Sequence, residues 1–261
     1  MAVKKVKKKA NNVVYTANMA MKDQRCNACA NMRYSTDSDV IQGVFLYELS
    51  NRFRCVVSIN GENQICYMPS SCKITPLVDL QGKTVLLQRM QNSKLKFSVF
   101  AVKIGRSHCL LNLSKANDII AQQLYRNFFS SLGKRKNIAM EKTVEGYRSD
   151  LYIEDTQMIV EVKTVLSFNK QAHFSSVYSV RAIKQLQKIE ELLAKGYKVC
   201  YLIVALCPKV KAVIINENSP IYPWLRRCSA QGMLIYGISL HMKDGRFEVY
   251  SNISVDIVMN E

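Results

Sequence analysis

Three side chains have the types and spacing of a metal-dependent hydrolytic site: Asp150, Glu161 and Lys163. Glu161 and Lys163 are two residues apart in the β-branched run 158–165, which predicts a strand, and side chains two apart in a strand share a face. If Asp150 approaches Glu161 from the preceding strand, the two carboxylates and the backbone carbonyl of Val162 can hold Mg²⁺ or Mn²⁺, because these cations prefer oxygen ligands. We therefore expect one divalent cation here.

Lys163 supplies the group that acts on water. An amine beside the metal can orient or deprotonate the attacking water, while the metal offsets the charge that develops on a phosphate. A plainer interpretation stays open, because Glu-x-Lys is common on strands and the same residues can form a structural ion pair. The order of the surrounding elements, the upstream Asp150 and the basic surface favour the catalytic interpretation.

The second half of the chain predicts a mixed α/β domain around this strand. Ser114 can cap a helix whose apolar residues recur at helical spacing until Gly133 stops it. The run 199–206 is almost entirely apolar, which is typical of a strand in the centre of a sheet. The other expected elements are paired strands at 137–144 and 147–153, helices at 180–194 and 222–231, and a last strand at 234–240.

Short alternating runs separated by turn residues predict a small antiparallel barrel in the first half. Asn60-Gly61 is a strong hairpin signal, and Gln81-Gly82 marks a second turn. We expect a basic, flexible lead-in at residues 1–38, an OB-like β-barrel at residues 39–114 and the α/β domain at residues 115–261. The expected barrel strands lie at 43–49, 53–59, 64–68, 84–90, 97–104 and 109–113.

The chain is strongly basic, with a formal net charge of +17, and it stays basic without the five lysines among its first ten residues. Such a charge attracts polyanions, because binding to phosphates releases condensed counterions, although an anionic membrane or plain solubility would be served as well. We expect nucleic acid as the partner, and charge alone does not choose between DNA and RNA. We expect no membrane insertion, because the longest apolar runs are too short to span one.

The candidate contacts to nucleic acid share a positive charge and an expected place on the surface. They are Arg52, Arg54, Lys94 and Lys96 in the barrel, and Arg148, Arg181 and Lys184 in the second half. The barrel cations alternate with aromatic residues, and rings can stack on bases while cations follow phosphates. We nevertheless expect Phe53 and Phe97 to fill the barrel interior.

The nine cysteines indicate a reduced, cytoplasmic protein, because no apolar secretion signal accompanies them. Cys26 and Cys29 form a Cys-x-x-Cys pair, but no second pair completes it, so we do not expect zinc. The sequence predicts no oligomeric state. Four cysteines in apolar surroundings are expected to be small buried hydrophobes: Cys109, Cys200, Cys207 and Cys228.

This order of elements resembles the PD-(D/E)XK nuclease superfamily, whose signature falls on Asp150, Glu161 and Lys163. The match is closer still to the sugar fermentation stimulation protein family, which pairs an N-terminal OB-like domain with a nuclease-like C-terminal domain and is described as DNA-binding. The resemblance implies the same two-domain fold for this chain, and it implies DNA, rather than RNA, as the ligand. It covers residues 40–255 and rests on Leu46, Arg52-Phe53, Met68 to Ser71, Asn112, Ser114, Arg148, Asp150, Val160 to Val165, Phe174, Arg181, Lys184, Leu186 and Gly196.

The chain also departs from the family's pattern. Where the family tends to place acids on the first helix of the second domain, this chain has Ala121 and Gln122, which argues against a second metal ion. After Phe174, the family's Pro-Asp is replaced by Ser175-Ser176, and its Arg-Gly-Gln by Arg181-Ala182-Ile183. These changes are compatible with metal binding by the core pair, and they weaken the case for cleavage.

Three functional hypotheses follow from these patterns. The first is a nucleic-acid-binding protein with a Mg²⁺-dependent, endonuclease-type site that hydrolyses phosphodiesters. The second is a non-enzymatic, sequence-nonspecific DNA-binding regulatory protein of the sugar fermentation stimulation type. The third is a protein that binds another anion, in which the acid–lysine group is a structural ion pair.

Overall fold

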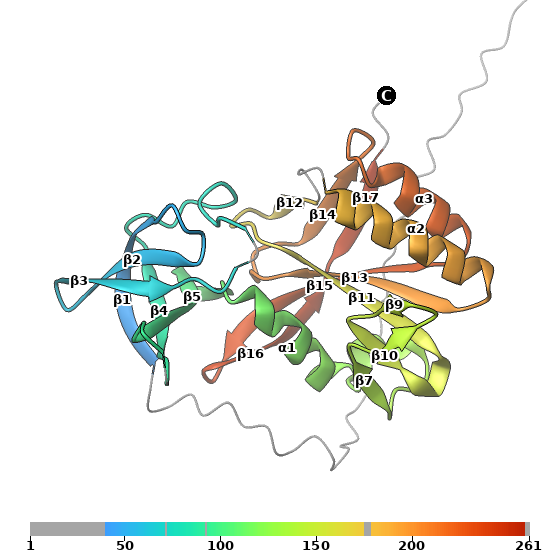
Figure 1. Ribbon diagram of the computed structural model, residues 1–261, viewed down its shortest axis with the longest axis horizontal. Coiled ribbons are helices and arrows are strands. Elements are labelled where there is room, and N and C mark those ends of the chain that lie inside the picture. Colours follow the sequence, from blue (N-terminus) through green and yellow to red (C-terminus); the bar gives the residue numbers. More distant parts are fainter. Residues whose placement is uncertain (1–39, 71, 92, 175–178, 259–261) are drawn as a thin grey trace, which may run out of the picture.

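A computed structural model describes residues 40–258 except residues 71, 92 and 175–178. The predicted lead-in at residues 1–38 and the Cys26-x-x-Cys29 pair lie outside these described residues. Figure 1 shows the first strands of the chain gathered at one end of the molecule. A β part is followed by an α/β part, so the predicted mixed α/β class is confirmed.

The first part is a curled sheet that closes on itself. Its strands pair in the order β3-β2-β1-β4-β5-β6, and a further parallel pairing of β3 with β5, at Tyr67 and Ser98, closes the ring. Alternation places one face of each strand inside, where Phe45, Val57 and Leu87 are buried. The strands are β1 (Val40–Glu48), β2 (Arg54–Ile59), β3 (Glu62–Tyr67), β4 (Thr84–Arg89), β5 (Phe97–Ile104) and β6 (Ser107–Leu110).

The turn between β2 and β3 has the predicted hairpin chemistry. Asn60 and Gly61 both take positive φ, 52° and 85°, as a two-residue turn that matches the twist of its strands requires. Ile59 and Glu62 are cross-strand partners on either side of it. The Asn-Gly signal therefore fixes the register of this hairpin.

The second sheet carries the predicted chemical residues. Its strands lie in the order β16-β15-β13-β11-β10-β7, and β13 is buried from its second residue onward, which confirms the predicted central strand. β11, β13 and β15 run parallel, whereas β10 pairs antiparallel with β11. The strands are β7 (Ile138–Met140), β10 (Leu151–Ile153), β11 (Met158–Val165), β13 (Lys198–Ala205), β15 (Leu234–Lys243) and β16 (Arg246–Asn252).

Helices flank this sheet. In Figure 1, α2 (Val180–Ala194) and α3 (Tyr222–Ala230) lie side by side above it, and α1 (Ala116–Gln123) lies below it. The 3₁₀ helices η2 (Leu113–Lys115), η3 (Asn127–Leu132) and η4 (Glu154–Thr156) are short connectors. Within the described ranges, no helix is both long enough and apolar enough to cross a membrane.

The prediction of one continuous helix over residues 114–133 is wrong, because α1 ends and η3 begins inside that range. The guanidinium of Arg135 binds carbonyls at the break: its Nε donates to Leu124 at 2.8 Å and its Nη2 to Arg126 at 3.5 Å. Helical periodicity contains no sign of such a partner. The stop at Gly133, which has a φ of 78°, is confirmed.

Some short strands were not predicted from the sequence: β12 (Gln171–His173), β14 (Ala212–Asn216) and β17 (Ser254–Val258) form a parallel sheet in the order β12-β14-β17. β8 (Thr143–Val144) and β9 (Tyr147–Arg148) pair with each other within the predicted paired strands 137–144 and 147–153. The prediction that the last strand lies at 234–240 is therefore wrong, because β16 and β17 follow it. β14 alternates buried and half-buried residues over only five positions, too short a run to stand out.

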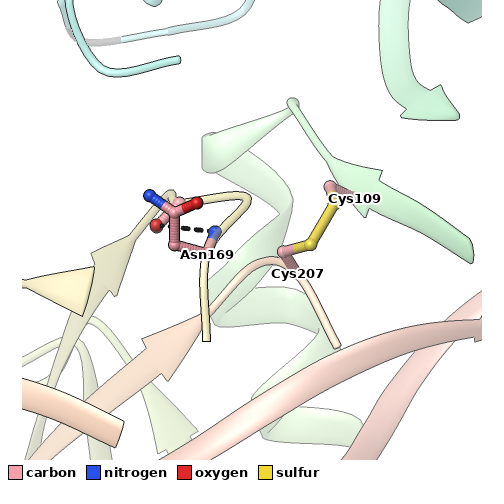
Figure 2. The surroundings of a disulfide bond; sticks show 4 residues. Cys109, Asn169 and Cys207 are labelled. Atoms are coloured by element: carbon pink, nitrogen blue, oxygen red, sulfur yellow. Dashed lines mark hydrogen bonds between the residues drawn. A yellow bond between two sulfur atoms is a disulfide. The ribbon is translucent and has the colours of Figure 1, made fainter. Parts of the chain in front are cut away.

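The two parts are tied together at β6. Leu110 donates its N–H to the carbonyl of Leu206 at 2.9 Å, and Cys109 forms a disulfide with Cys207 (Figure 2). The expectation of reduced thiols is wrong for this pair, although both side chains are buried as predicted. The two cysteines are 98 residues apart, so only the tertiary fold reveals the pairing. One hydrophobic cluster runs through both parts, and the domain limit at residues 114/115 stays a prediction.

Candidate metal and hydrolytic site

The candidate site lies where β10 leaves the edge of β11. Leu151 and Val160 are the last cross-strand partners of the two strands before they separate. Just beyond them, Oδ2 of Asp150 accepts the backbone N–H of Val162 at 2.8 Å, and Oδ1 accepts the side-chain amide of Asn117 at 3.2 Å. Asp150 is therefore fixed against the strand that carries Glu161 and Lys163.

Glu161 and Lys163 meet on one face of β11. Nζ of Lys163 donates to Oε1 of Glu161 at 2.6 Å and to the side-chain oxygen of Gln185 on α2 at 2.9 Å. The other carboxylate oxygen of Glu161 accepts the phenolic O–H of Tyr147 at 2.5 Å. Glu161 is only 1% exposed, so these partners replace water around a buried acid.

The electrostatics of the site follow from this burial. Burial raises the pKa of the Glu161 carboxyl; the Lys163 ammonium opposes the rise, and the neighbouring Asp150 adds to it. Burial also raises the pKa of Tyr147 well above its usual range, and the charge of Glu161 acts in the same direction. The Tyr147 phenol therefore stays protonated and can keep donating to the carboxylate.

A cleft of 310 Å³ opens over these groups. Its lining includes Asp150, Glu161 and Lys163 on one wall and the first turn of α2, with Ser179 and Arg181, on the other. Ser179 caps this helix by accepting the N–H of Ala182 at 3.3 Å. Acids, an ammonium and a guanidinium thus converge on a space that a small charged group can enter.

Comparison with known proteins decides the family. Residues 114–246, more than half of the chain, match the family model described as the sugar fermentation stimulation protein RE domain. The chain belongs to the sugar fermentation stimulation protein family. The predicted resemblance to this family is therefore confirmed.

Relatives span most of the chain. A sugar fermentation stimulation protein homolog from Desulfitobacterium hafniense is 24% identical over 234 residues, which cover 87% of this chain and 99% of the relative. A homolog from Ruminiclostridium cellulolyticum is 24% identical over 83% of this chain and 97% of its own. The structure of Pyrococcus furiosus SfsA in complex with Ca²⁺ covers 84% of this chain and 96% of its own with a TM-score of 0.72 at 17% identity, and it shows the shared fold.

The remaining predicted cations of the α/β part differ in their surroundings. Arg181 lines the cleft, whereas Lys184, one turn along α2, lines a second hollow beside it. Arg148 on β9 is exposed and forms an ion pair with Glu141. The structure therefore places Arg181 at the candidate site and Lys184 next to it. Arg148 lies elsewhere on the surface, in its ion pair with Glu141.

The barrel cations lie apart from the cleft. Arg52, Arg54, Lys94 and Lys96 are exposed, and no described residue lining the cleft comes from the barrel. Phe97 is buried, as expected.

The expectation that Phe53 is buried is wrong, since its side chain is 37% exposed. It precedes β2 rather than lying in its alternation, stacks on Tyr67 with ring centroids 6.3 Å apart, and carries the guanidinium of Arg52 4.6 Å above its ring.

Two partners of the site were missed from the sequence, Asn117 and Tyr147, whereas Gln185 is expected on the helix beside the site but without its contact to Lys163. Asn117 lies 33 residues from Asp150, Tyr147 14 from Glu161, and Gln185 22 from Lys163. Asn117, rather than Ala121 or Gln122, is the α1 residue that contacts an acid of the site. No periodic signal marks them, because each is an ordinary polar residue whose role depends on tertiary packing.

Proposed function

We propose that this protein binds nucleic acid, DNA foremost, and hydrolyses its phosphodiester backbone at the cleft formed by Asp150, Glu161 and Lys163. One observation carries the proposal: two acids and a lysine converge on the open edge of β11, inside a cleft flanked by Arg181. An acid pair with a positioned amine is a donor set for metal-assisted hydrolysis rather than for nucleophilic catalysis.

The oxygen donors fit one hard divalent cation. A carboxylate has about four acceptor positions, so Asp150 and Glu161 each keep free lone pairs beside the hydrogen bonds they accept. The N–H of Val162 points to Asp150, and its carbonyl lies on the same edge of the strand, because both groups of a strand residue face the same side. The described residues contain no cluster of three His, Cys, Asp or Glu side chains, so the proposed ion relies on two carboxylates and one backbone carbonyl.

We propose Mg²⁺ or Mn²⁺ as this ion, held by Asp150, Glu161 and the Val162 carbonyl. The Pyrococcus furiosus relative was solved with Ca²⁺, which prefers oxygen ligands as Mg²⁺ does. When bound, such a cation lowers the pKa of water and offsets charge on a phosphate. Zinc is not part of the proposal, because it favours sulfur and nitrogen ligands.

The chain's own residues position the reactants. Lys163 is held between Glu161 and Gln185, so its ammonium projects into the cleft with a fixed direction, where it can orient the attacking water. Arg181, on the opposite wall, can bind a non-bridging phosphate oxygen through its planar fork of donors. Tyr147 keeps Glu161 aligned from the side away from Lys163.

Binding of the nucleic acid is assigned to the exposed cations of both parts. Near the cleft, Arg181 and Lys184 contact the phosphates of the bound nucleic acid, and Arg148 on β9 adds a further positive charge. In the barrel, Arg52 lies over the exposed ring of Phe53, and Arg54, Lys94 and Lys96 add exposed positive charge, so this part offers partners for both bases and phosphates. We propose that residues 39–114 form an OB-like domain and residues 115–261 a nuclease-like domain.

The second candidate is a non-enzymatic DNA-binding protein of the same fold. A specific observation favours it: each carboxylate oxygen of the two acids accepts a hydrogen bond from the protein itself, as a purely structural ion-pair network would require. Both candidates predict binding, and only the first predicts strand scission.

The experiment is scission and gel shift of labelled single- and double-stranded DNA and RNA, with Mg²⁺, Mn²⁺ or EDTA. Wild type, Glu161→Ala and Lys163→Ala are compared, with Lys198→Ala as a charge control, since Lys198 is exposed and lies outside the cleft. We expect salt-sensitive binding by all four proteins, and metal-dependent scission by wild type and Lys198→Ala alone.

Other outcomes reject the proposal. A salt-sensitive shift without scission in either metal selects the non-enzymatic candidate. Equal loss of binding and scission in Glu161→Ala and Lys163→Ala indicates structural damage rather than catalysis. Absence of any shift at low salt rejects both candidates.

A further inference from the structure

A second hollow lies directly beside the catalytic cleft. It has a volume of 370 Å³ and is lined by Tyr147, Val180, Arg181, Lys184, Gln185 and Lys188. Arg181 and Gln185 line both spaces, so the hollow continues the cleft along α2. Tyr147, the phenol that donates to Glu161, forms part of its wall.

The hollow is positively charged. Its lining carries three cations, Arg181, Lys184 and Lys188, and none of its described lining residues is an acid. The three recur at positions i, i+3 and i+7 of α2, so they form one stripe on the helix. Lys188 pairs with Glu191 at 2.7 Å, but the Glu191 side chain is 61% exposed, and a pair of this kind is weak enough to be exchanged for a phosphate.

The geometry points to a binding track for the phosphates that flank the reacting one, running along α2 from Arg181 to Lys188. This inference rests on the proposed function and adds the path of the strand to it. From Arg181 to Lys188 the helix rises by about 10 Å, at 1.5 Å per residue. Charges on one strand of a duplex lie about 3.4 Å apart along its axis, so the stripe is long enough for more than one phosphate.

The uncharged lining suits a nucleotide chain as well. Val180 is 51% exposed beside Arg181 and offers an apolar contact to a sugar. Tyr147 in this lining is buried and already hydrogen-bonded to Glu161, so a nucleic-acid strand bound in the hollow would contact the residue that aligns the acid. The positive charge of the hollow and its continuity with the cleft therefore favour the same occupant. This is the sugar-phosphate backbone of the nucleic-acid strand whose reacting phosphate lies at Lys163.

The test is the salt dependence of oligonucleotide binding. Each phosphate contact that is lost lowers the slope of log Kd against log salt by about 0.7–0.9. Wild type, Lys184→Ala and Lys188→Ala are compared by fluorescence anisotropy with one labelled oligonucleotide, in EDTA so that it stays intact. Two controls are matched: Lys198→Ala removes the same charge elsewhere, and Glu191→Gln removes the partner of Lys188 without removing a donor to phosphate.

We expect the slope to fall by about that amount in Lys184→Ala and in Lys188→Ala, and to be unchanged in both controls, with equal melting temperatures. Slopes equal to wild type in both lysine variants overturn the inference, while metal-dependent scission lost in Glu161→Ala would leave the proposed function standing. Equal slope losses in Lys198→Ala also overturn it, because the effect would then be one of net charge.

A second arm separates a strand from a free anion. Inorganic phosphate is titrated into wild type and Lys184→Ala by calorimetry at constant ionic strength. Weak phosphate binding alongside the expected slope losses agrees with a track for a strand. Saturable phosphate binding that needs Lys184, together with unchanged slopes, shows a site for a free ion and overturns the inference.

Discussion

Glu161 is a buried acid whose place in the fold works against its charged form. Folding raises its pKa, so the folded protein binds a proton at this site more tightly than the unfolded chain does. Ionising the buried Glu161 therefore lowers the free energy of unfolding. This loss is absent below the usual pKa of a glutamic acid and grows as the pH rises toward the pKa of Glu161 in the folded protein. The proposed metal binding by Glu161 would account for such a cost.

Replacing this acid should therefore stabilise the metal-free protein. We expect Glu161→Gln to raise the free energy of unfolding at pH 7.5, and each 1 kcal/mol gained corresponds to about 2–4 °C in Tm for a chain of this size. The difference should shrink toward pH 4, where the wild-type acid is protonated in both states. Thermal unfolding in EDTA across this pH range measures it. A less stable Gln variant at pH 7.5 would show that the ion pair with Lys163 outweighs burial.

Tyr147 is a positioning residue for Glu161. Removing its hydroxyl in Tyr147→Phe frees one carboxylate oxygen from its partner, and loss of such an orienting bond lowers metal affinity by about 10–100-fold. Calorimetry with Mn²⁺ measures the change, with the Tm as a check on folding. The matched control is Tyr152→Phe, a buried tyrosine of β10 whose ring contacts Lys142. Equal Mn²⁺ affinities in wild type and Tyr147→Phe would refute the positioning role.

Residue types alone pointed to Asp150, Glu161 and Lys163, because strand alternation and the need for oxygen donors are local arguments. Tyr147 and Asn117 could not be found in this way. Each is brought to the site by an element whose position depends on the packing of the whole sheet.

At the scale of elements, α1 supplies a neutral partner to Asp150 rather than a third acid. It presents Asn117 to Asp150, and a neutral amide there leaves the site with two carboxylates. We expect Asn117→Asp to bind Mn²⁺ about tenfold more tightly, because affinity follows the number of charged ligands. It should also lower the Tm in EDTA, because like charges then repel. Calorimetry and melting curves test both, with Asn63→Asp, the same change at an exposed residue of β3 in the barrel, as the control. Unchanged affinity would show that Asn117 does not face the ion.

The elements differ in how far the sequence predicted them. The ranges of β11 and α2 match the expected ones residue for residue, since each has a clean period and clear ends. The break between α1 and η3 depends on Arg135, and β14 and β17 depend on each other across long sequence separations. Local periodicity cannot encode contacts of this kind.

At the scale of the whole molecule, the disulfide between Cys109 and Cys207 joins the barrel to the central sheet across 98 residues. Closing so long a loop restricts the unfolded chain, and such links contribute about 2–4 kcal/mol. We expect reductant to lower the free energy of unfolding by this amount in guanidinium titrations. The variant Cys109→Ala/Cys207→Ala should not respond to reductant. A wild type that is equally stable with and without reductant would show that the link does not form in solution.

The net charge of +17 and the cleft act together in the proposed function, since the charge gathers the strand and the cleft acts on it. The most direct test is the rate of Mg²⁺-dependent scission at saturating DNA, measured for wild type and Lys163→Ala with Kd determined in parallel. We expect kcat to fall by about 10²–10⁴ in the variant, with Kd within a few-fold of wild type. Equal rates in the two proteins, or a wild type that binds DNA and never cuts it, would contradict a hydrolytic role for this site.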